Sequence, residues 1–214
     1  MPRAATDDTR TRLLRAGLAI ARRSGLRAVT VRGVTARAKA NLGSFVHHFG
    51  TREAFLGEMV EGWYAPLLAR LQLTLDDSGP VLERLRRFCL ALLQFLAEHR
   101  VFVTHVLLDA AAGEAPARRF VQALPARHPA LLLRLIAEAQ ARGEIHPAEP
   151  PPHVMLFILG ALALPLVAFT ATGGAQLLPE GFVRQVQPYA FEPEHLARRL
   201  DWVLAGLRPK DPLP

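Results

Sequence analysis

His47 and His48 are adjacent, and they are the first residues of this chain whose types suggest chemistry. Two histidines on one helix share a metal ion when they lie three or four residues apart, because only then do they point from the same face. Adjacent helical residues point about 100° apart, so this pair does not predict a metal site. The chain also has no phosphate-cradling glycine loop, no metal-spaced Cys/His cluster and no Gly-x-Ser-x-Gly motif. We therefore expect no catalytic residues, no metal and no cofactor, and a protein that is not an enzyme.

The arginines carry the second kind of chemistry, and their distribution is one-sided. Residues 1–60 hold 11 Lys and Arg against 4 Asp and Glu, which accounts for the whole net charge of +7. No acidic residue lies between Asp8 and Glu53. A surface of this kind is typical of a protein that meets a polyanion. The alternative is a solvated basic face without a partner.

Two further features bear on where the protein works. The single cysteine, Cys89, cannot form an internal disulfide, and the arginine-rich start does not resemble a secretion signal, so we expect a cytoplasmic protein. Residues 154–171 are uncharged and reach the lower limit of a membrane span. They contain Gly160 and Pro165 and lack flanking Lys or Arg anchors. We expect a helix buried between a core and a partner subunit, and a membrane span is the alternative.

The elements that position these residues are predicted to be helices. Apolar spacing predicts a first helix over residues 7–24, ended by Gly25. Thr30 is the expected N-cap of a second helix that reaches Ala38, and Asn41 the N-cap of a third that ends before Gly50. The brief turn between the last two gives a helix-turn-helix pattern.

The rest of the chain is expected to be all-α. Thr51 caps a fourth helix that bends near Pro66 and ends by residue 76. Further helices are predicted over residues 82–99, 101–112, 116–124, 129–143, 151–171 and 193–207. The proline-rich end, 209–214, is expected to be a disordered tail.

Residues 10–56 resemble the N-terminal DNA-binding domain of the TetR (tetracycline-repressor) family of bacterial regulators. The features that carry the resemblance are Gly25, Thr30-Val31, Gly43-Ser44, His48-Phe49 and Arg52-Glu53-Ala54. Two positions depart from the family pattern. Lys39 stands where the family usually has glycine in the turn, and Val46 stands where it usually has a tyrosine that donates to a phosphate.

The resemblance implies a helix-turn-helix DNA-binding domain over residues 1–51 and an effector-binding and dimerisation domain over 52–208. It implies a homodimeric, ligand-responsive regulator, most often a repressor, that binds a palindromic operator as double-stranded DNA and is released by a small molecule. The alternative is an all-α small-molecule-binding or catalytic protein that retains the helix-turn-helix without DNA function.

In a helix-turn-helix the second helix of the pair enters the major groove. Phe45 and Phe49 lie one turn apart on the side predicted to be buried, so the other residues of that helix face the groove. Arg52 is a cation in the first turn of a helix, where the macrodipole prefers an anion, and a DNA phosphate would resolve that conflict. The predicted DNA-binding residues are Thr30, Arg32, Lys39, Asn41, Leu42, Gly43, Ser44, Val46, His47, His48, Thr51 and Arg52.

For the second domain the sequence suggests an apolar effector pocket, since its aromatic residues come with few polar ones. The candidate ligand-binding residues are Trp63, Phe88, Leu92, Phe95, Phe102, His105, Met155 and Phe169, and for most of them ordinary core is the favoured alternative. The helices over 151–171 and 193–207 are the expected dimer face, in an intersubunit four-helix bundle. The alternative is that they complete the core of one subunit.

Overall fold

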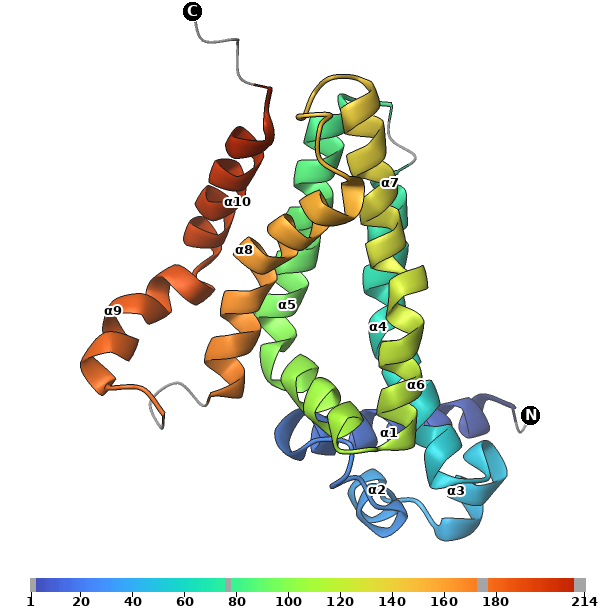
Figure 1. The fold of residues 1–214 in the computed structure, drawn as a ribbon. Coiled ribbons are helices and arrows are strands. Elements are labelled where there is room, and N and C mark those ends of the chain that lie inside the picture. The colour runs from blue at the N-terminus through green and yellow to red at the C-terminus, as the bar shows by residue number, and fades with distance from the viewer. Residues whose placement is uncertain (1–2, 76–77, 173–176, 210–214) are drawn as a thin grey trace, which may run out of the picture. The chain divides into compact units, whose positions relative to one another are not determined.

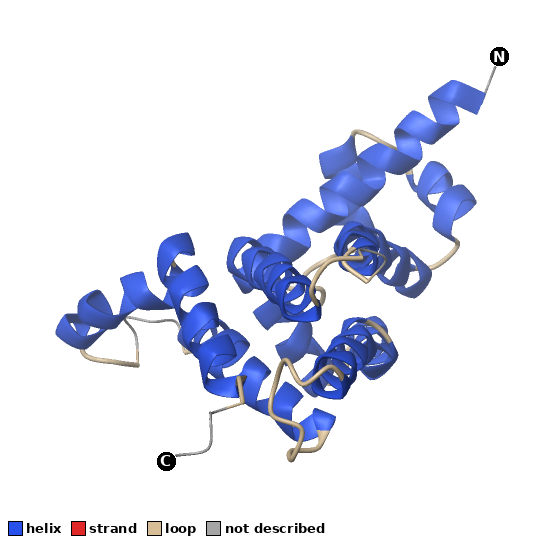
Figure 2. Cartoon of the chain, turned by 90° about the horizontal axis from the view of Figure 1, so that it is seen from above, coloured by secondary structure: helices blue, strands red, loops and turns tan. Residues whose placement is uncertain are grey.

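The computed structural model describes residues 3–75, 78–172 and 177–209, with side chains from residue 8 onward. Within these ranges the chain is helical and contains no strand (Figure 2). In chain order the elements are α1 (Arg3–Ser24), α2 (Val31–Ala38), α3 (Leu42–Phe49), α4 (Arg52–Leu73), α5 (Val81–Ala111), α6 (Ala115–Ala123), the 3₁₀ turn η1 (Leu124–Ala126), α7 (His128–Ala141), α8 (Pro151–Ala171), α9 (Glu180–Phe191) and α10 (Pro193–Leu207) (Figure 1).

The helices form two compact units, and the chain passes from one unit to the other within α4, within α5 and after α6. The first unit comprises residues 1–66 and 101–123, and the second comprises 67–100 and 124–214. Of these three crossings, the two that fall inside a helix lie at an irregularity of that helix. Pro66 lies inside α4, and His99 has non-helical dihedral angles (φ −109°, ψ 15°) inside α5. The predicted DNA-binding segment therefore folds together with the start of α4 and with residues 101–123.

Three short-range hydrogen bonds cap the N-termini of α2, α3 and α4 in the first unit. The hydroxyl of Thr30 accepts from the Gly33 N–H at 3.1 Å, and the Asn41 Oδ1 accepts from the Ser44 N–H at 2.7 Å. At the start of α4 the Thr51 hydroxyl accepts from the Ala54 N–H at 3.1 Å. All three N-caps are confirmed as predicted, because each oxygen meets an N–H that has no partner within its own helix.

A buried charge network organises the second unit. Arg84 is almost fully buried, donates to the carbonyls of Thr74 and Leu75 just after α4, and pairs with Glu138 of α7 at 2.9 Å. Glu144, which follows α7, accepts from the N–H groups of Val81 and Leu82 at the start of α5. These two side chains tie the ends of three helices together without any local sequence signal.

Most predicted helices are confirmed. The predicted helices over 82–99 and 101–112 form the two parts of α5, which meet at a kink at His99. Helix α9 was not predicted. The predicted disordered tail lies outside the described residues, apart from Pro209.

Two helices of the described part are long and apolar enough to cross a membrane by length and composition, α5 with a mean hydropathy of 1.2 and α8 with 2.4. Only 22% of the α8 window is buried within the chain. Val154, Ile158, Leu162 and Leu166 form a buried stripe along α8. Its other sides expose Leu156, Phe157 and Leu164.

Candidate nucleic-acid interface

The orientation of α3 follows from its two phenylalanines. Phe45 and Phe49 are 1% and 8% exposed, and both pack against Phe55 of α4 with ring centroids 5.1 and 4.9 Å apart. The opposite face presents Leu42 and Val46, which are 62% and 51% exposed. A short helix held by one aromatic cluster thus offers a fixed outward face, as the sequence predicted.

The remaining residues of this face are small, polar or imidazole side chains. Gly43 and His47 are exposed and Ser44 is half-buried. Because the Asn41 Oδ1 caps α3, its amide N–H₂ is the part left to donate to a base or a phosphate. The face can therefore offer a few polar donors and two apolar surfaces, which suits direct contact with thymine methyl groups and few hydrogen bonds.

The two histidines lie in the last turn of α3 without forming a metal site. Their ring centroids are 5.2 Å apart, edge to face, and the His48 ring also lies 6.0 Å from that of Phe49. Neither belongs to a group of three metal-ligand side chains within the described residues.

Lys39 forms the turn that the family usually builds with glycine. It adopts the left-handed conformation (φ 51°, ψ 46°), and it is the one non-glycine residue with positive φ in the described part of the chain. Its N–H and that of Ala40 bond back to the carbonyls of Ala36 and Thr35, so the end of α2 is closed in the ordinary way. Lysine thus holds the left-handed conformation that closes α2.

Arg52 behaves differently from the sequence-based expectation. Its guanidinium donates to the Val29 carbonyl at 2.6 Å and to the Leu26 carbonyl at 2.8 Å, both in the loop between α1 and α2. It also pairs with the carboxylate of Glu114, with Nη1 and Oε1 3.0 Å apart. The sequence assigned Arg52 to a phosphate because a cation in the first turn of a helix is disfavoured by the macrodipole. Glu114 provides an anion for Arg52 from within the chain, and contact with a phosphate stays a prediction.

A second acidic residue holds the same loop. The Asp109 Oδ2 accepts from the Leu26 N–H at 2.6 Å. A Cβ on Gly25, which has a φ of 80°, would lie 2.8 Å from that oxygen, so the close approach requires glycine. Asp109 and Glu114 were missed because they lie 83 and 62 residues from their partners.

The eight candidate effector residues divide between the two units. In the first unit Trp63 packs edge to face on Phe102 at 4.7 Å, and His105 is half-buried. In the second unit Phe88 and Leu92 are buried core. The other three, Phe95, Met155 and Phe169, are half-buried. Their assignment to a ligand stays a prediction.

The second unit also has a hollow of about 530 Å³ between the start of α5 and the end of α10. It is lined by Pro80, Leu82, Glu83, Arg86, Glu144, Asp201, Leu204, Ala205 and Arg208. Arg86 and Asp201 pair across it at 2.8 Å. None of the candidate effector residues lines it, and its charged walls do not suit the apolar effector expected from the sequence.

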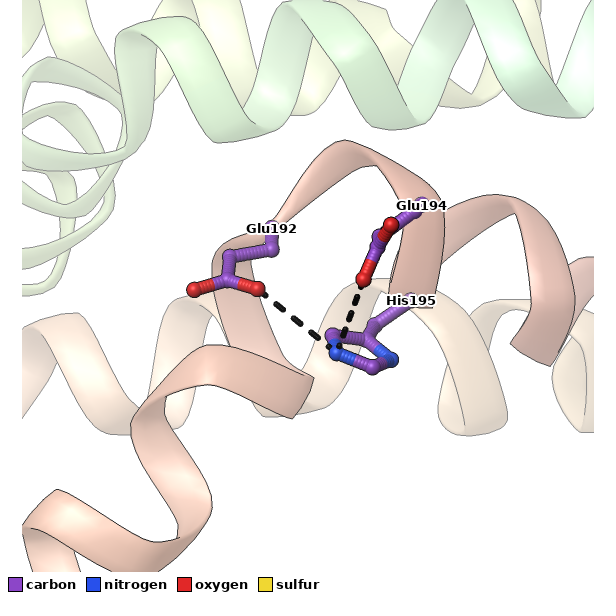
Figure 3. A group of neighbouring side chains, drawn as sticks. All are labelled: Glu192, Glu194 and His195. Atoms are coloured by element: carbon purple, nitrogen blue, oxygen red, sulfur yellow. Dashed lines mark ion pairs between the residues drawn. The ribbon is translucent and has the colours of Figure 1, made fainter.

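Glu192, Glu194 and His195 gather where α9 meets α10 (Figure 3). The His195 Nε2 lies 3.6 Å from Glu192 and 3.4 Å from Glu194. The carboxylates sit at the N-terminus of α10, where the helix dipole favours negative charge, and both are exposed. The close approach of the imidazole to the two exposed carboxylates does not by itself indicate a ligand, and we assign no metal to the group.

Comparison with known proteins finds relatives along most of the chain. Residues 13–59 match the family model described as bacterial regulatory proteins, tetR family, and residues 78–165 match the tetracyclin repressor-like C-terminal domain. Together the two models cover more than half of the chain.

Among curated proteins, the chain is 32% identical over 111 residues to the HTH-type transcriptional repressor KstR2 of Mycobacterium tuberculosis, covering 52% of this chain and 55% of that protein. It is 30% identical over 88 residues to the HTH-type transcriptional repressor DhaR of Mycobacterium sp., covering 41% and 44%. The chain thus spans about half the length of the curated relatives it matches.

Solved structures resemble almost the entire chain. The ketosteroid transcriptional regulator KstR2 of Mycobacterium tuberculosis superposes with a TM-score of 0.65 at 22% identity, covering 94% of this chain and 95% of that one. The regulator FadR from Bacillus subtilis, solved in complex with stearoyl-CoA, superposes with a TM-score of 0.68 at 14% identity, covering 92% and 99%. At these identities the likeness shows the fold.

Proposed function

The chain belongs to the tetR family of bacterial regulatory proteins, and from this we propose that it is a ligand-responsive transcriptional regulator. In this proposal it binds a palindromic operator as a homodimer, acts as a repressor and is released by a small apolar effector. The observation that carries the proposal is the outward face of α3, fixed by Phe45 and Phe49 in the part of the chain that carries the excess positive charge. We place its activity in the cytoplasm, where the DNA lies.

Base recognition is assigned to the exposed residues of α3. Leu42 and Val46 are exposed enough to pack on thymine methyl groups, and Ser44 and His47 can exchange hydrogen bonds with base edges. None of these side chains makes the bidentate contact to guanine that arginine makes, so part of the sequence preference is expected to come from DNA shape. Asn41 and Arg32 are the bidentate-capable residues nearby.

Backbone contacts are assigned to Thr30, Lys39, His48 and Thr51, which flank the two helices of the motif. The hydroxyls of Thr30 and Thr51 already accept from backbone N–H groups, so each can donate its own proton to a phosphate. We leave the Arg52 guanidinium out of this set, because its hydrogen bonds are used within the chain. Arg52 contributes to binding by holding the loop between α1 and α2 and the start of α4 together.

The homodimer is proposed to form through α8 and α10. Leu156, Phe157 and Leu164 lie on the sides of α8 away from its buried stripe, and Trp202 of α10 is 69% exposed. Large apolar side chains gathered on two helices of a water-soluble regulator mark a protein interface. A second copy of the chain satisfies the two-fold symmetry that a palindromic operator requires.

The effector is proposed to be largely apolar. The names of two proteins similar in fold refer to ketosteroids and to a fatty acyl thioester, both of which carry large hydrocarbon parts. In the first unit of this chain, Trp63, Phe102 and Phe120 form an aromatic cluster. The buried hydroxyl of Thr104 on α5 has no hydrogen-bond partner within the described residues. That hydroxyl suits one oxygen of an otherwise apolar ligand.

The direct test of base recognition is selection of randomised duplexes by the wild-type protein and by Ser44→Ala and His47→Ala variants. We expect the wild type to select an inverted repeat, and each variant to lose preference at one position per half-site. Selection of the same motif by all three proteins would remove these residues from base recognition. The other candidate, an all-α binding or catalytic protein without DNA function, would enrich no motif, and the repressor names of the curated relatives do not favour it.

A further inference from the structure

An open hollow of about 430 Å³ lies on the first unit. One wall comes from the middle of α1 and the other from the end of α2. It is lined by Arg12, Arg15, Ala16, Ala19, Arg37, Ala38 and Lys39. Every side chain of the lining is either a cation or an alanine, and no acidic residue contributes to it.

The four cations are poorly neutralised by the protein itself. Arg12 donates to the Thr9 hydroxyl at 3.2 Å and lies 3.6 Å from Asp8. Within the described residues Arg15, Arg37 and Lys39 make no hydrogen bond or ion pair through their side chains. Like charges gathered in one concave surface repel one another and concentrate a positive potential there. Such a surface is suited to an anion that no part of this chain provides.

The helix dipole explains only half of this arrangement. Arg37 and Lys39 lie at the C-terminus of α2, where cations are favoured. Arg12 and Arg15 are three residues apart in the middle of α1, where no dipole favours them, and they face the same hollow. If these cations were only a solvated surface, nothing would favour the convergence of the α1 arginines on the C-terminus of α2.

Lys39 adds an independent observation. Its left-handed backbone (φ 51°) is one that glycine adopts freely and that a residue with a Cβ adopts at a cost. The turn therefore carries a strained residue where an unstrained one is available. A cationic side chain is what the chain gains from lysine at this position, and that side chain lines the hollow.

We propose that this hollow binds phosphate groups of the DNA backbone, beside the base-reading helix. The inference rests on the proposed DNA-binding function and adds Arg12, Arg15 and Arg37 to its contacts. Lys39 lies two residues before the N-cap of α3, so a backbone bound here belongs to the same duplex that α3 reads. Arginine forks bind phosphate oxygens in pairs, and the hollow is open enough to take part of a continuous strand.

Lys39→Gly separates this role from a structural one, because the two predict opposite changes. Glycine relieves the strained turn, so the melting temperature is expected to rise by about 2–4 °C. The same change removes a phosphate contact. Affinity for the selected duplex should fall several-fold, and the slope of log K against log salt should flatten by about one. A stabilised variant with unchanged affinity and slope would overturn the role of Lys39.

The arginines are tested together against a control of equal charge. Arg15→Ala/Arg37→Ala is expected to flatten the salt slope by one to two and to weaken binding to specific and random duplexes alike. Arg22→Ala/Arg23→Ala removes two exposed arginines from the last turn of α1, outside the hollow, and should leave the slope within half a unit of wild type. Equal slopes for the two double variants would overturn the proposal.

Inorganic phosphate, added to the protein without DNA, distinguishes a free anion from the DNA backbone. If it raises the melting temperature of the wild type and not of Arg15→Ala/Arg37→Ala, while the two salt slopes agree, the hollow binds a free phosphate and the proposal is wrong. A wild-type protein that binds no duplex at all would overturn the proposed function as well. If the wild type binds the duplex and Arg15→Ala/Arg37→Ala has the same salt slope as the wild type, only this inference is overturned.

Discussion

The ion pair between Arg52 and Glu114 gives the sharpest quantitative prediction. The carboxylate is 13% exposed, the guanidinium 31%, and their closest atoms are 3.0 Å apart. Hydrogen bonds to charged groups contribute roughly 1.5–3 kcal/mol when formed, and Gln keeps one acceptor, so Glu114→Gln should lower the free energy of unfolding by ~1–2 kcal/mol. Arg52→Ala also leaves the carbonyls of Leu26 and Val29 without their donor, which raises the expected loss to ~3 kcal/mol.

Urea and thermal unfolding measure these losses. For a chain of this length ~3 kcal/mol corresponds to a fall in melting temperature of roughly 6–12 °C. Arg70→Ala is the matched control, since Arg70 lies on the same helix and donates only to the exposed Gln94. It should cost less than about 0.5 kcal/mol. In the double variant Arg52→Ala/Glu114→Ala the losses should fall short of additivity by ~1–2 kcal/mol, because the pair can be lost only once.

The affinity for DNA and its salt dependence distinguish a structural role of Arg52 from a phosphate contact. If it positions the helix-turn-helix from within, Arg52→Ala weakens binding while the salt slope stays at the wild-type value, because no phosphate contact is lost. Glu114→Gln should also weaken binding. The removal of a negative charge would by itself strengthen binding to DNA, so a weaker affinity would indicate the loss of the structural contact. The reasoning is refuted if Arg52→Ala leaves stability unchanged and flattens the slope by about one, since Arg52 would then contact phosphate.

Two further predictions concern the second unit. Phe157→Glu/Leu164→Glu on α8 should convert a dimer into a monomer in sedimentation equilibrium, and persistence of the dimer would exclude this face. Leu73→Glu, at a more exposed leucine at the end of α4, is the control and should leave the dimer intact. Burial, with a smaller contribution from Arg127, lowers the pKa of His128 to about 4 from an ordinary 6.5, so the unfolded chain binds a proton that the folded chain does not. Stability should therefore be constant above pH 6.5 and fall by up to ~3 kcal/mol as the pH drops to 4. His128→Gln should flatten this dependence and exposed His153→Gln should not, as measured by urea unfolding across the pH range; identical profiles would contradict the assignment.

The helix-turn-helix could be predicted from the sequence because its determinants are local. Thr30, Asn41 and Thr51 each cap a helix through an N–H three residues away, and Phe45 and Phe49 set the buried side of α3 by their spacing. The face opposite the phenylalanines follows from these positions alone.

The role of Arg52 could not be predicted, because its partner is set by the fold. Glu114 lies 62 residues along the chain and reaches Arg52 only through the packing of residues 101–123 with the DNA-binding segment. The local dipole argument identified a cation that favours a nearby anion, and the fold supplies a carboxylate, Glu114, that local sequence does not show. The basic hollow is similar, since the sum of the charges follows from composition and the packing of α1 against α2 decides which of them converge.

Helix α9 was missed for a different reason. It contains Pro188, and it buries only Val183 and Ala190, so it lacks the apolar stripe by which a surface helix is usually recognised. Most of its residues depend on tertiary context for their conformation.

Selection of bound fragments from genomic DNA tests DNA recognition and dimerisation together. We expect enrichment of an inverted repeat whose half-sites lie one helical turn, or a multiple of it, apart. Enrichment of no motif would contradict DNA recognition, and a motif without two-fold symmetry would contradict the dimer.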